Sequence, residues 1–368
     1  MNLSSLKEFL PTPAAAAVDS GRLAELQAFE KSKAGVKGLV DSGIQTVPRI
    51  FIRPPEDRAG DPIQGGDWEV PVIDLTGIES DRRRKIVSDV GEASREWGFF
   101  QVVNHGIPAE VLELMLGGVR EFHEQETEKK TALHSRDMMQ QVKYSSNIDL
   151  YRSRAANWRD TLTVSLTMSD QIQPHLLPQV CRDSTLDYID HVKKLADILF
   201  ELLSEALGLE RGHLGALGCN QGRVVLCHYY PPCPEPEFTL GTSSHTDPSF
   251  LTILLQDQLG GLQVLHDKKY INVQPVSGSL VVNIGDMLQI ISNDEFISAD
   301  HRVIANKIGP RISVASFFSG ESRSGKIYAP LPNKQPRYKE FTVRDYIIKF
   351  TQRPIEKSGL DEFRLPEE

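Results

Sequence analysis

The sequence lacks several patterns that would each indicate a familiar class of protein. Its 368 residues include only four cysteines, and no two of these have CxxC spacing, so neither a disulfide framework nor a zinc knuckle is predicted. There is no strand–GxGxxG–helix fingerprint, which argues against a hydride-transfer enzyme on a dinucleotide-binding fold. HExxH and GxSxG are also missing, so the zinc-protease and serine-hydrolase motifs are not available.

Basic charge and long apolar runs are also scarce. Lys and Arg number 41 against 50 Asp and Glu, giving a formal net charge of −9, which makes nucleic acid and anionic membranes poor candidate partners. The apolar runs are short and interrupted, so no segment is predicted to span a bilayer. The N-terminus has no basic start followed by an apolar run, so we expect no secretory signal and a cytoplasmic location with free thiols.

Two kinds of periodicity divide the chain. Apolar residues recur at helical spacing in four segments: 21–40, 80–97, about 108–134 and 187–208. From residue 223 to residue 318 short β-like runs follow one another, SLVVNIGDMLQIIS among them, with turn residues between them. This succession predicts an antiparallel sandwich or jelly roll in the second half of the chain.

One pair of polar residues stands at the entrance of a buried strand. In TSSHTDPSFLTILLQ, His245 and Asp247 are two residues apart, so on a strand both side chains point to the same face. Most HxD pairs are surface or capping residues. A third donor, His301 in SADHRVIAN, begins a later β-run. Two histidines and one carboxylate form the facial triad that favours non-haem Fe(II) and leaves coordination positions open.

The strand RISVASFF presents an unusual face. Arg311, Ser313, Ala315 and Phe317 alternate with apolar residues and so share one side of the strand. An edge strand with its polar face in water would explain such alternation. Beside an iron triad, the pattern instead predicts a socket in which a guanidinium and a hydroxyl grip a carboxylate, with Phe317 lining the adjoining substrate space. In RVVLCHYYPPCP, Tyr230 is a further candidate donor to that carboxylate, and packing beside the prolines is the alternative.

Taken together, HTD, the distant HRV, RIS and YYPPCP resemble the plant 2-oxoglutarate- and Fe(II)-dependent dioxygenases. VPVIDL, WGFFQVVNHGI and NWRDT in the first half are similar to the N-terminal region of that family. LQAFEKSKAGVKGLVDSGIQTVPRIF resembles the branch called 1-aminocyclopropane-1-carboxylate oxidase homologues, whose members resemble 2-oxoglutarate-using hydroxylases of plant specialised metabolism. The resemblance covers roughly residues 35 to 350.

The resemblance implies an α+β fold, with a distorted double-stranded β-helix (jelly-roll) core flanked by helices. It implies that His245, Asp247 and His301 bind iron, that Arg311 and Ser313 bind 2-oxoglutarate, and that Tyr230 assists. Many relatives have Asn where this chain has His228. We also expect substrate contacts from Phe317 and from the region of Tyr144. The expected domains are an N-terminal extension and linker (1–65), an N-terminal non-haem dioxygenase region (66–185), a long helix (186–220), the jelly-roll core (221–322) and a C-terminal helix and tail (323–368).

The expected activity is hydroxylation of a plant specialised metabolite, with O₂ consumed and succinate and CO₂ released. Ascorbate is expected to be supportive, and the protein is expected to be a monomer without nucleic-acid or membrane partners. An ascorbate-driven, 2-oxoglutarate-independent oxidase of the ethylene-forming kind shares HxD…H and RxS, so these motifs leave it open. Desaturation and demethylation also remain open, as does a binding protein built on a degenerate jelly roll.

Overall fold

The computed structural model describes residues 20–60, 68–167, 171–322, 325–332, 335–353 and 357–366. Residues 1–19 and 61–65 of the predicted N-terminal extension and linker lie outside the described residues. None of the helices in the described ranges is both long and apolar enough to cross a membrane.

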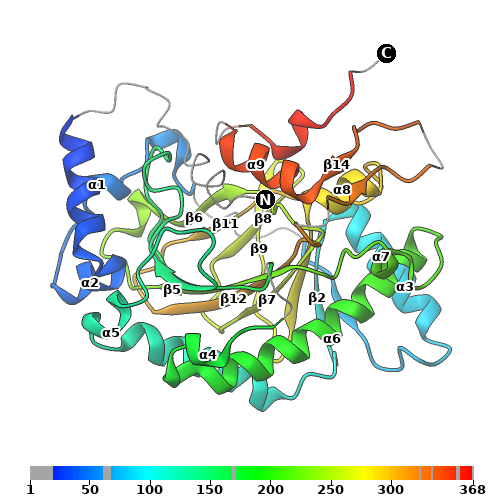
Figure 1. The fold of residues 1–368 in the computed structure, drawn as a ribbon, viewed down its shortest axis with the longest axis horizontal. Helices are drawn as coiled ribbons and strands as arrows, with labels where there is room; N and C mark the ends of the chain where they lie inside the picture. The colour runs from blue at the N-terminus through cyan, green and yellow to red at the C-terminus, as the bar shows by residue number, and fades with distance from the viewer. Residues whose placement is uncertain are drawn as a thin grey trace.

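A mixed sheet of eight strands runs through the centre of the molecule (Figure 1). In spatial order its strands are β1 (Val72–Asp74), β2 (Phe99–Val103), β10 (Leu280–Ile284), β7 (Leu251–Gln256), β12 (Arg311–Phe318), β5 (Arg223–Tyr230), β4 (Asp160–Ser165) and β3 (Val142–Ser145). β1 and β2 are parallel, and the other neighbours are antiparallel. Strands of the predicted N-terminal region therefore form both edges of the sheet, and strands of the predicted core lie between them.

A smaller sheet packs against one face of the large one. Its strands, in spatial order, are β6 (Leu240–His245), β11 (His301–Ile304), β8 (Leu262–His266) and β9 (Lys269–Asn272). Leu262 and Val303 of this sheet share a buried cluster with Tyr230 and Val281 of the large sheet. The two sheets with their helices confirm the predicted jelly-roll core flanked by helices. A short hairpin of β13 (Ile327–Tyr328) and β14 (Phe341–Thr342) lies outside both sheets.

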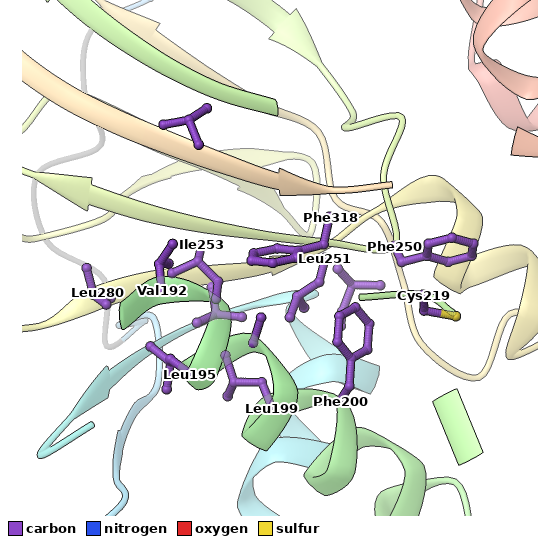
Figure 2. Packing of buried hydrophobic residues seen from close by; sticks show 14 of the residues in the cluster. Val192, Leu195, Leu199, Phe200, Cys219, Phe250, Leu251, Ile253, Leu280 and Phe318 are labelled. Atoms are coloured by element: carbon purple, nitrogen blue, oxygen red, sulfur yellow. The ribbon is translucent and has the colours of Figure 1, made fainter. Parts of the chain in front are cut away.

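Three helices cover the other face of the large sheet: α3 (Arg83–Glu96), α4 (Ala109–Glu124) and α6 (Arg182–Ala206). On α6, Val192, Leu195 and Leu199 recur at helical spacing and are buried. Figure 2 shows this row facing Leu251 of β7 and Phe318 of β12. This packing makes the sheet a rigid support for its opposite face. The remaining helices are α1 (Ser20–Ser32), α2 (Gly35–Asp41), α5 (Thr127–Thr131), α7 (His213–Ala216), α8 (Asp286–Ile291) and α9 (Val343–Gln352).

Two elements differ from the sequence-based predictions. The helix predicted over 108–134 is divided into α4 and α5, because the backbone of Gln125 is extended. The buried Lys130 ammonium donates a hydrogen bond of 2.7 Å to the His123 carbonyl near the end of α4. The run SLVVNIGDMLQIIS is strand β10 followed by helix α8. Gly285 separates them at a point where a Cβ atom would lie 2.1 Å from the Ser249 carbonyl oxygen.

Asp160, the fourth residue of NWRDT, ties the N-terminal helices to the large sheet. Its fully buried carboxylate accepts hydrogen bonds of 2.8 Å from the backbone amides of Val36 and Lys37 in α2. The Ser146 hydroxyl donates to the same carboxylate. Burial raises the pKa of Asp160, and these donors oppose that effect. The carboxylate thus anchors α2 to the first residue of strand β4.

We expect Asp160→Ala to lower the free energy of unfolding by about 2–4 kcal/mol, because it leaves buried donors without an acceptor. Asp41→Ala is the matched control. Asp41 forms an exposed ion pair with Lys37 and should contribute less than about 1 kcal/mol. Urea unfolding measures both values, and equal losses in the two variants would contradict the anchoring role of Asp160.

Candidate metal centre and the adjoining cavity

The three predicted iron ligands meet at one end of the small sheet. His245 is the last residue of β6 and His301 is the first residue of β11, directly opposite it in the antiparallel pair. The Nε2 atoms of His245 and His301 each lie 3.6 Å from Oδ1 of Asp247. One ligand atom from each of the three residues lies within 4.8 Å of the others. The predicted triad is therefore assembled in space.

Backbone carbonyls orient both imidazole rings. Nδ1 of His245 lies 2.8 Å from the Ser243 carbonyl oxygen, and Nδ1 of His301 lies 3.2 Å from the Ala299 carbonyl oxygen. Because a carbonyl only accepts, these contacts assign the ring proton to Nδ1 and leave the Nε2 lone pair directed at the centre of the triad.

The Asp247 carboxylate has one satisfied oxygen and one unsatisfied oxygen. Oδ2 accepts hydrogen bonds from the Thr252 hydroxyl at 2.7 Å and from the Asn283 amide at 2.8 Å. Oδ1 is buried and has no hydrogen-bond partner among the described residues. A buried carboxylate oxygen without a partner is costly, and a cation between the three ligand atoms would remove that cost.

The protonation states also suit a metal. Burial tends to raise the pKa of Asp247, but the two neighbouring imidazoles and its two donors outweigh burial and hold the pKa below its ordinary value. Burial, followed by the charge of His301, lowers the pKa of His245. At neutral pH the carboxylate is therefore charged and the His245 ring is neutral, which are the forms that bind metal. The donor set fits Fe(II).

Arg311 lies in the same cavity, away from the triad. The cavity has a volume of about 50 Å³ and is lined by both sheets. The Arg311 guanidinium is 3% exposed and donates to the Gly260 carbonyl at 2.6 Å, to Ser313 Oγ at 3.0 Å and to Gln256 Oε1 at 2.8 Å. All three acceptors are neutral, and Arg311 forms no ion pair within the described residues. A buried cation of this kind is ready to bind an anion.

Strand β12 is central in the large sheet. It pairs with β5 on one side and with β7 on the other, so the edge-strand alternative for RISVASFF is wrong. Its two faces differ because α4 covers one of them and the cavity lies on the other. Arg311, Ser313, Ala315 and Phe317 all line the cavity, as the alternation predicts.

The other predicted contacts have different positions. Tyr230 lines the cavity with its ring 5.0 Å from the Arg311 guanidinium, but its hydroxyl lies 3.2 Å from Thr242 Oγ1. Phe317 also lines the cavity. Tyr144 does not: its fully buried ring packs against Phe122, and its hydroxyl donates to the Ala34 carbonyl at 3.3 Å. Tyr144 is a core residue and is not among the residues that line this cavity.

Three residues near the site were not predicted. Thr252 and Asn283 bind Asp247, and Arg159 lines the cavity. Arg159 belongs to the NWRDT segment, so a signal for it was present in the sequence. Thr252 and Asn283 had no such signal, because their position depends on the register between β7 and β10, where they are cross-strand partners.

His228 lines the cavity but is not part of the triad. Its Nδ1 lies 2.9 Å from Thr161 Oγ1. Burial, followed by the positive charge of Arg159 and Arg311, holds the pKa of His228 well below its ordinary value. The ring is therefore neutral at physiological pH.

We expect His228→Asn to keep the iron affinity within about threefold of the wild-type value, because an asparagine preserves a polar partner for Thr161 and no ligand is removed. Metal titration measures this. A loss comparable to that of His245→Asn would show that His228 is an iron ligand.

Comparison with known proteins identifies the family. The family model described as the 2OG-Fe(II) oxygenase superfamily matches residues 221–320, and the model described as the non-haem dioxygenase in morphine synthesis N-terminal matches residues 70–180. The Arabidopsis thaliana protein 1-aminocyclopropane-1-carboxylate oxidase homolog 1 is 50% identical over 343 residues, 91% of this chain and 93% of that protein. The chain belongs to the 2OG-Fe(II) oxygenase superfamily. It is a 2-oxoglutarate-dependent non-haem iron dioxygenase, and its cofactors are Fe(II) and 2-oxoglutarate.

A second plant protein and a crystal structure are also similar to this chain. Deacetoxyvindoline 4-hydroxylase from Catharanthus roseus is 49% identical over 359 residues, 93% of this chain and 89% of that protein. The chain also resembles the one in the crystal structure of JOX2 in complex with 2OG, Fe, and JA. The two have 29% sequence identity and a TM-score of 0.80, and the match covers 90% of this chain and 98% of the JOX2 chain. The predicted family, Fe(II) and 2-oxoglutarate are confirmed, whereas the supportive role of ascorbate stays a prediction.

Proposed function

We propose that this oxygenase hydroxylates a plant specialised metabolite, with 2-oxoglutarate converted to succinate and CO₂. One observation carries the proposal: the cavity has an unpartnered carboxylate oxygen in the triad and, away from it, a buried arginine with only neutral partners. A dicarboxylate bound between a metal at the triad and Arg311 satisfies both.

In this proposal the protein's residues bind and orient the reactants. His245, Asp247 and His301 hold Fe(II), which together with 2-oxoglutarate supplies the activation of O₂. Arg311 and Ser313 bind the far carboxylate of 2-oxoglutarate, and Tyr230 forms the wall beside them. Phe317 is the one residue of β12 that is not fully buried, so it is available to contact substrate. The residue assignments rest on the fit of these side chains to the group.

The Arg311–Ser313 pair does not by itself separate this function from an ascorbate-driven oxidase. The two functions differ in what they consume: the proposed reaction forms succinate in step with substrate loss, and the oxidase does not require 2-oxoglutarate. Desaturation and demethylation also yield succinate, so the mass of the product distinguishes them from hydroxylation.

The test has two stages. The purified protein is first titrated with Fe(II) and then 2-oxoglutarate without oxygen, with binding followed by calorimetry and by the visible absorption of chelated 2-oxoglutarate. A library of phenolics, alkaloids, benzoxazinoid glucosides and glucosinolates is then screened for substrate-dependent succinate release. Saturable binding of 2-oxoglutarate and coupled succinate are expected. Substrate turnover that needs ascorbate but not 2-oxoglutarate would overturn the proposal.

We further propose that the protein acts as a cytoplasmic monomer without nucleic-acid or membrane partners. The three triad ligand atoms lie within 4.8 Å of one another in a single chain. The four cysteines are buried and unpaired, which suits a reducing compartment. Light scattering after size exclusion and microscopy of a tagged protein test these two statements.

A further inference from the structure

A second arginine, Arg159, lines the cavity next to the start of strand β4. Arg159 comes directly before β4 and lies between two fixed neighbours. The Trp158 indole donates to the Pro231 carbonyl at 3.2 Å, and Asp160 is the buried anchor of α2. Asp160 is paired with Tyr229, so the next position along each strand, Arg159 and Tyr230, is on the opposite, cavity-facing side. The guanidinium is therefore held in the cavity by its neighbours in the sequence.

Among the described residues, the guanidinium of Arg159 has no anionic partner. One terminal nitrogen donates to Thr242 Oγ1 at 2.8 Å, and Nε is buried with no hydrogen-bond partner in that part of the chain. No carboxylate pairs with Arg159 in the part of the chain that the structure describes. By contrast Arg154, five residues earlier on the surface, pairs with both Glu56 and Asp57. The chain thus supplies acidic partners to a nearby surface arginine and leaves this cavity arginine without one.

The two cavity arginines have different hydrogen-bond partners. Arg311 is held toward Gly260 and Gln256 at the end of β7, whereas Arg159 is held toward Thr242 on β6 of the other sheet. A carboxylate bound by Arg311 and Ser313 consequently leaves Arg159 with donors to spare. The charges agree with this division. The lining includes two arginines and one carboxylate, Asp247, and Fe(II) and the 2-oxoglutarate dianion cancel one another, so the loaded cavity retains one positive charge.

We propose that Arg159 binds a carboxylate of the substrate, so that the enzyme acts on acids and discriminates against their neutral analogues. This inference rests on the proposed function and specifies its substrate class. A single remaining positive charge matches a monocarboxylate. Charge-assisted hydrogen bonds from a guanidinium are strong where water is excluded, and Thr242 keeps the group directed into the cavity. Arg159 is then a specificity-determining residue separate from the 2-oxoglutarate socket.

The test uses full-length protein loaded with Fe(II) and 2-oxoglutarate in the absence of oxygen. Calorimetry compares trans-cinnamate with trans-cinnamamide, and benzoate with benzamide as a smaller pair. In at least one pair the acid should bind at least about tenfold more tightly than the amide, as expected for hydrogen bonds to a charged group. Arg159→Gln should reduce this preference to about twofold or less, Arg159→Lys should keep part of it, and the control Arg154→Gln should keep all of it.

Each outcome decides the question. Equal binding of acid and amide by the wild-type protein in both pairs would overturn the proposal without any variant. A preference that survives in Arg159→Gln would also overturn it. Weaker 2-oxoglutarate binding in Arg159→Gln with the acid preference intact would assign Arg159 to the cosubstrate instead. Failure of the wild-type protein to bind 2-oxoglutarate would count against the proposed function, and it is measured separately in the same titrations.

Discussion

Asp247→Ala is expected to abolish turnover and to weaken Fe(II) binding by at least about a hundredfold, since loss of a ligand should exceed the effect of losing its supporting contacts. The variant removes the only carboxylate of the triad, and the two imidazoles that remain cannot neutralise a divalent ion. It also removes the acceptor shared by Thr252 and Asn283. Iron content after dialysis and calorimetric titration measure the effect.

Two further variants test whether the loss of iron binding is due to the charge of Asp247. Asp247→Asn retains the shape of the side chain and one acceptor oxygen, so loss of iron in this variant reports the missing charge. Asp300→Asn removes an exposed carboxylate next to His301 and should leave iron binding unchanged. If Asp247→Asn kept wild-type iron affinity, Asp247 would not be a ligand.

Arg311→Gln is expected to weaken 2-oxoglutarate binding about a hundredfold, equivalent to about 3 kcal/mol, because a buried two-pronged contact to a carboxylate is lost. The KM for the substrate that is oxidised should change far less than the affinity for 2-oxoglutarate. Gln256 and Ser313 also lose their shared partner, so the melting temperature should be recorded alongside the 2-oxoglutarate titration.

Arg302 provides the matched control for Arg311. It is 9% exposed, it donates to Gln263 at 2.8 Å and it lies over the Tyr270 ring. Because its neighbours His301 and Val303 line the cavity, Arg302 faces away from it. Arg302→Gln should therefore leave 2-oxoglutarate affinity unchanged. Equal losses in the two variants would show that the effect of Arg311→Gln is a general loss of stability.

The alternation of side chains along strands made much of the site predictable. Arg311, Ser313 and Phe317 were placed on one face by the period of β12. The argument that put His245 and Asp247 on one strand was wrong, because β6 ends at His245 and Asp247 lies in the connection to β7, although their ligand atoms do meet. The substrate contact predicted for Tyr144 did not rest on side-chain alternation. In the structure its ring is buried in the core. Thr252 and Asn283 could not be found because strand register is set by packing over the whole sheet and is not visible in any one segment.

The pairing of distant strands was harder to predict than the chemistry of the site. The boundary expected at residue 185 separates strands that lie in one hydrogen-bonded sheet, where β4 pairs directly with β5. Sequence periodicity identifies the strands but does not say which distant strands become neighbours. The order β12–β5–β4 matters for function, because it brings Arg159 to the cavity that Arg311 also lines.

Strand β12 carries two sets of side chains with different surroundings. Phe318, Val314 and Ile312 belong to the core cluster that the helices complete, whereas Phe317 and Ala315 line the cavity on the other face. Substitutions in the second set can therefore change what the cavity accepts at little cost to folding. This gives a physical reason why proteins as similar to this chain as deacetoxyvindoline 4-hydroxylase, at 49% identity, need not share its substrate.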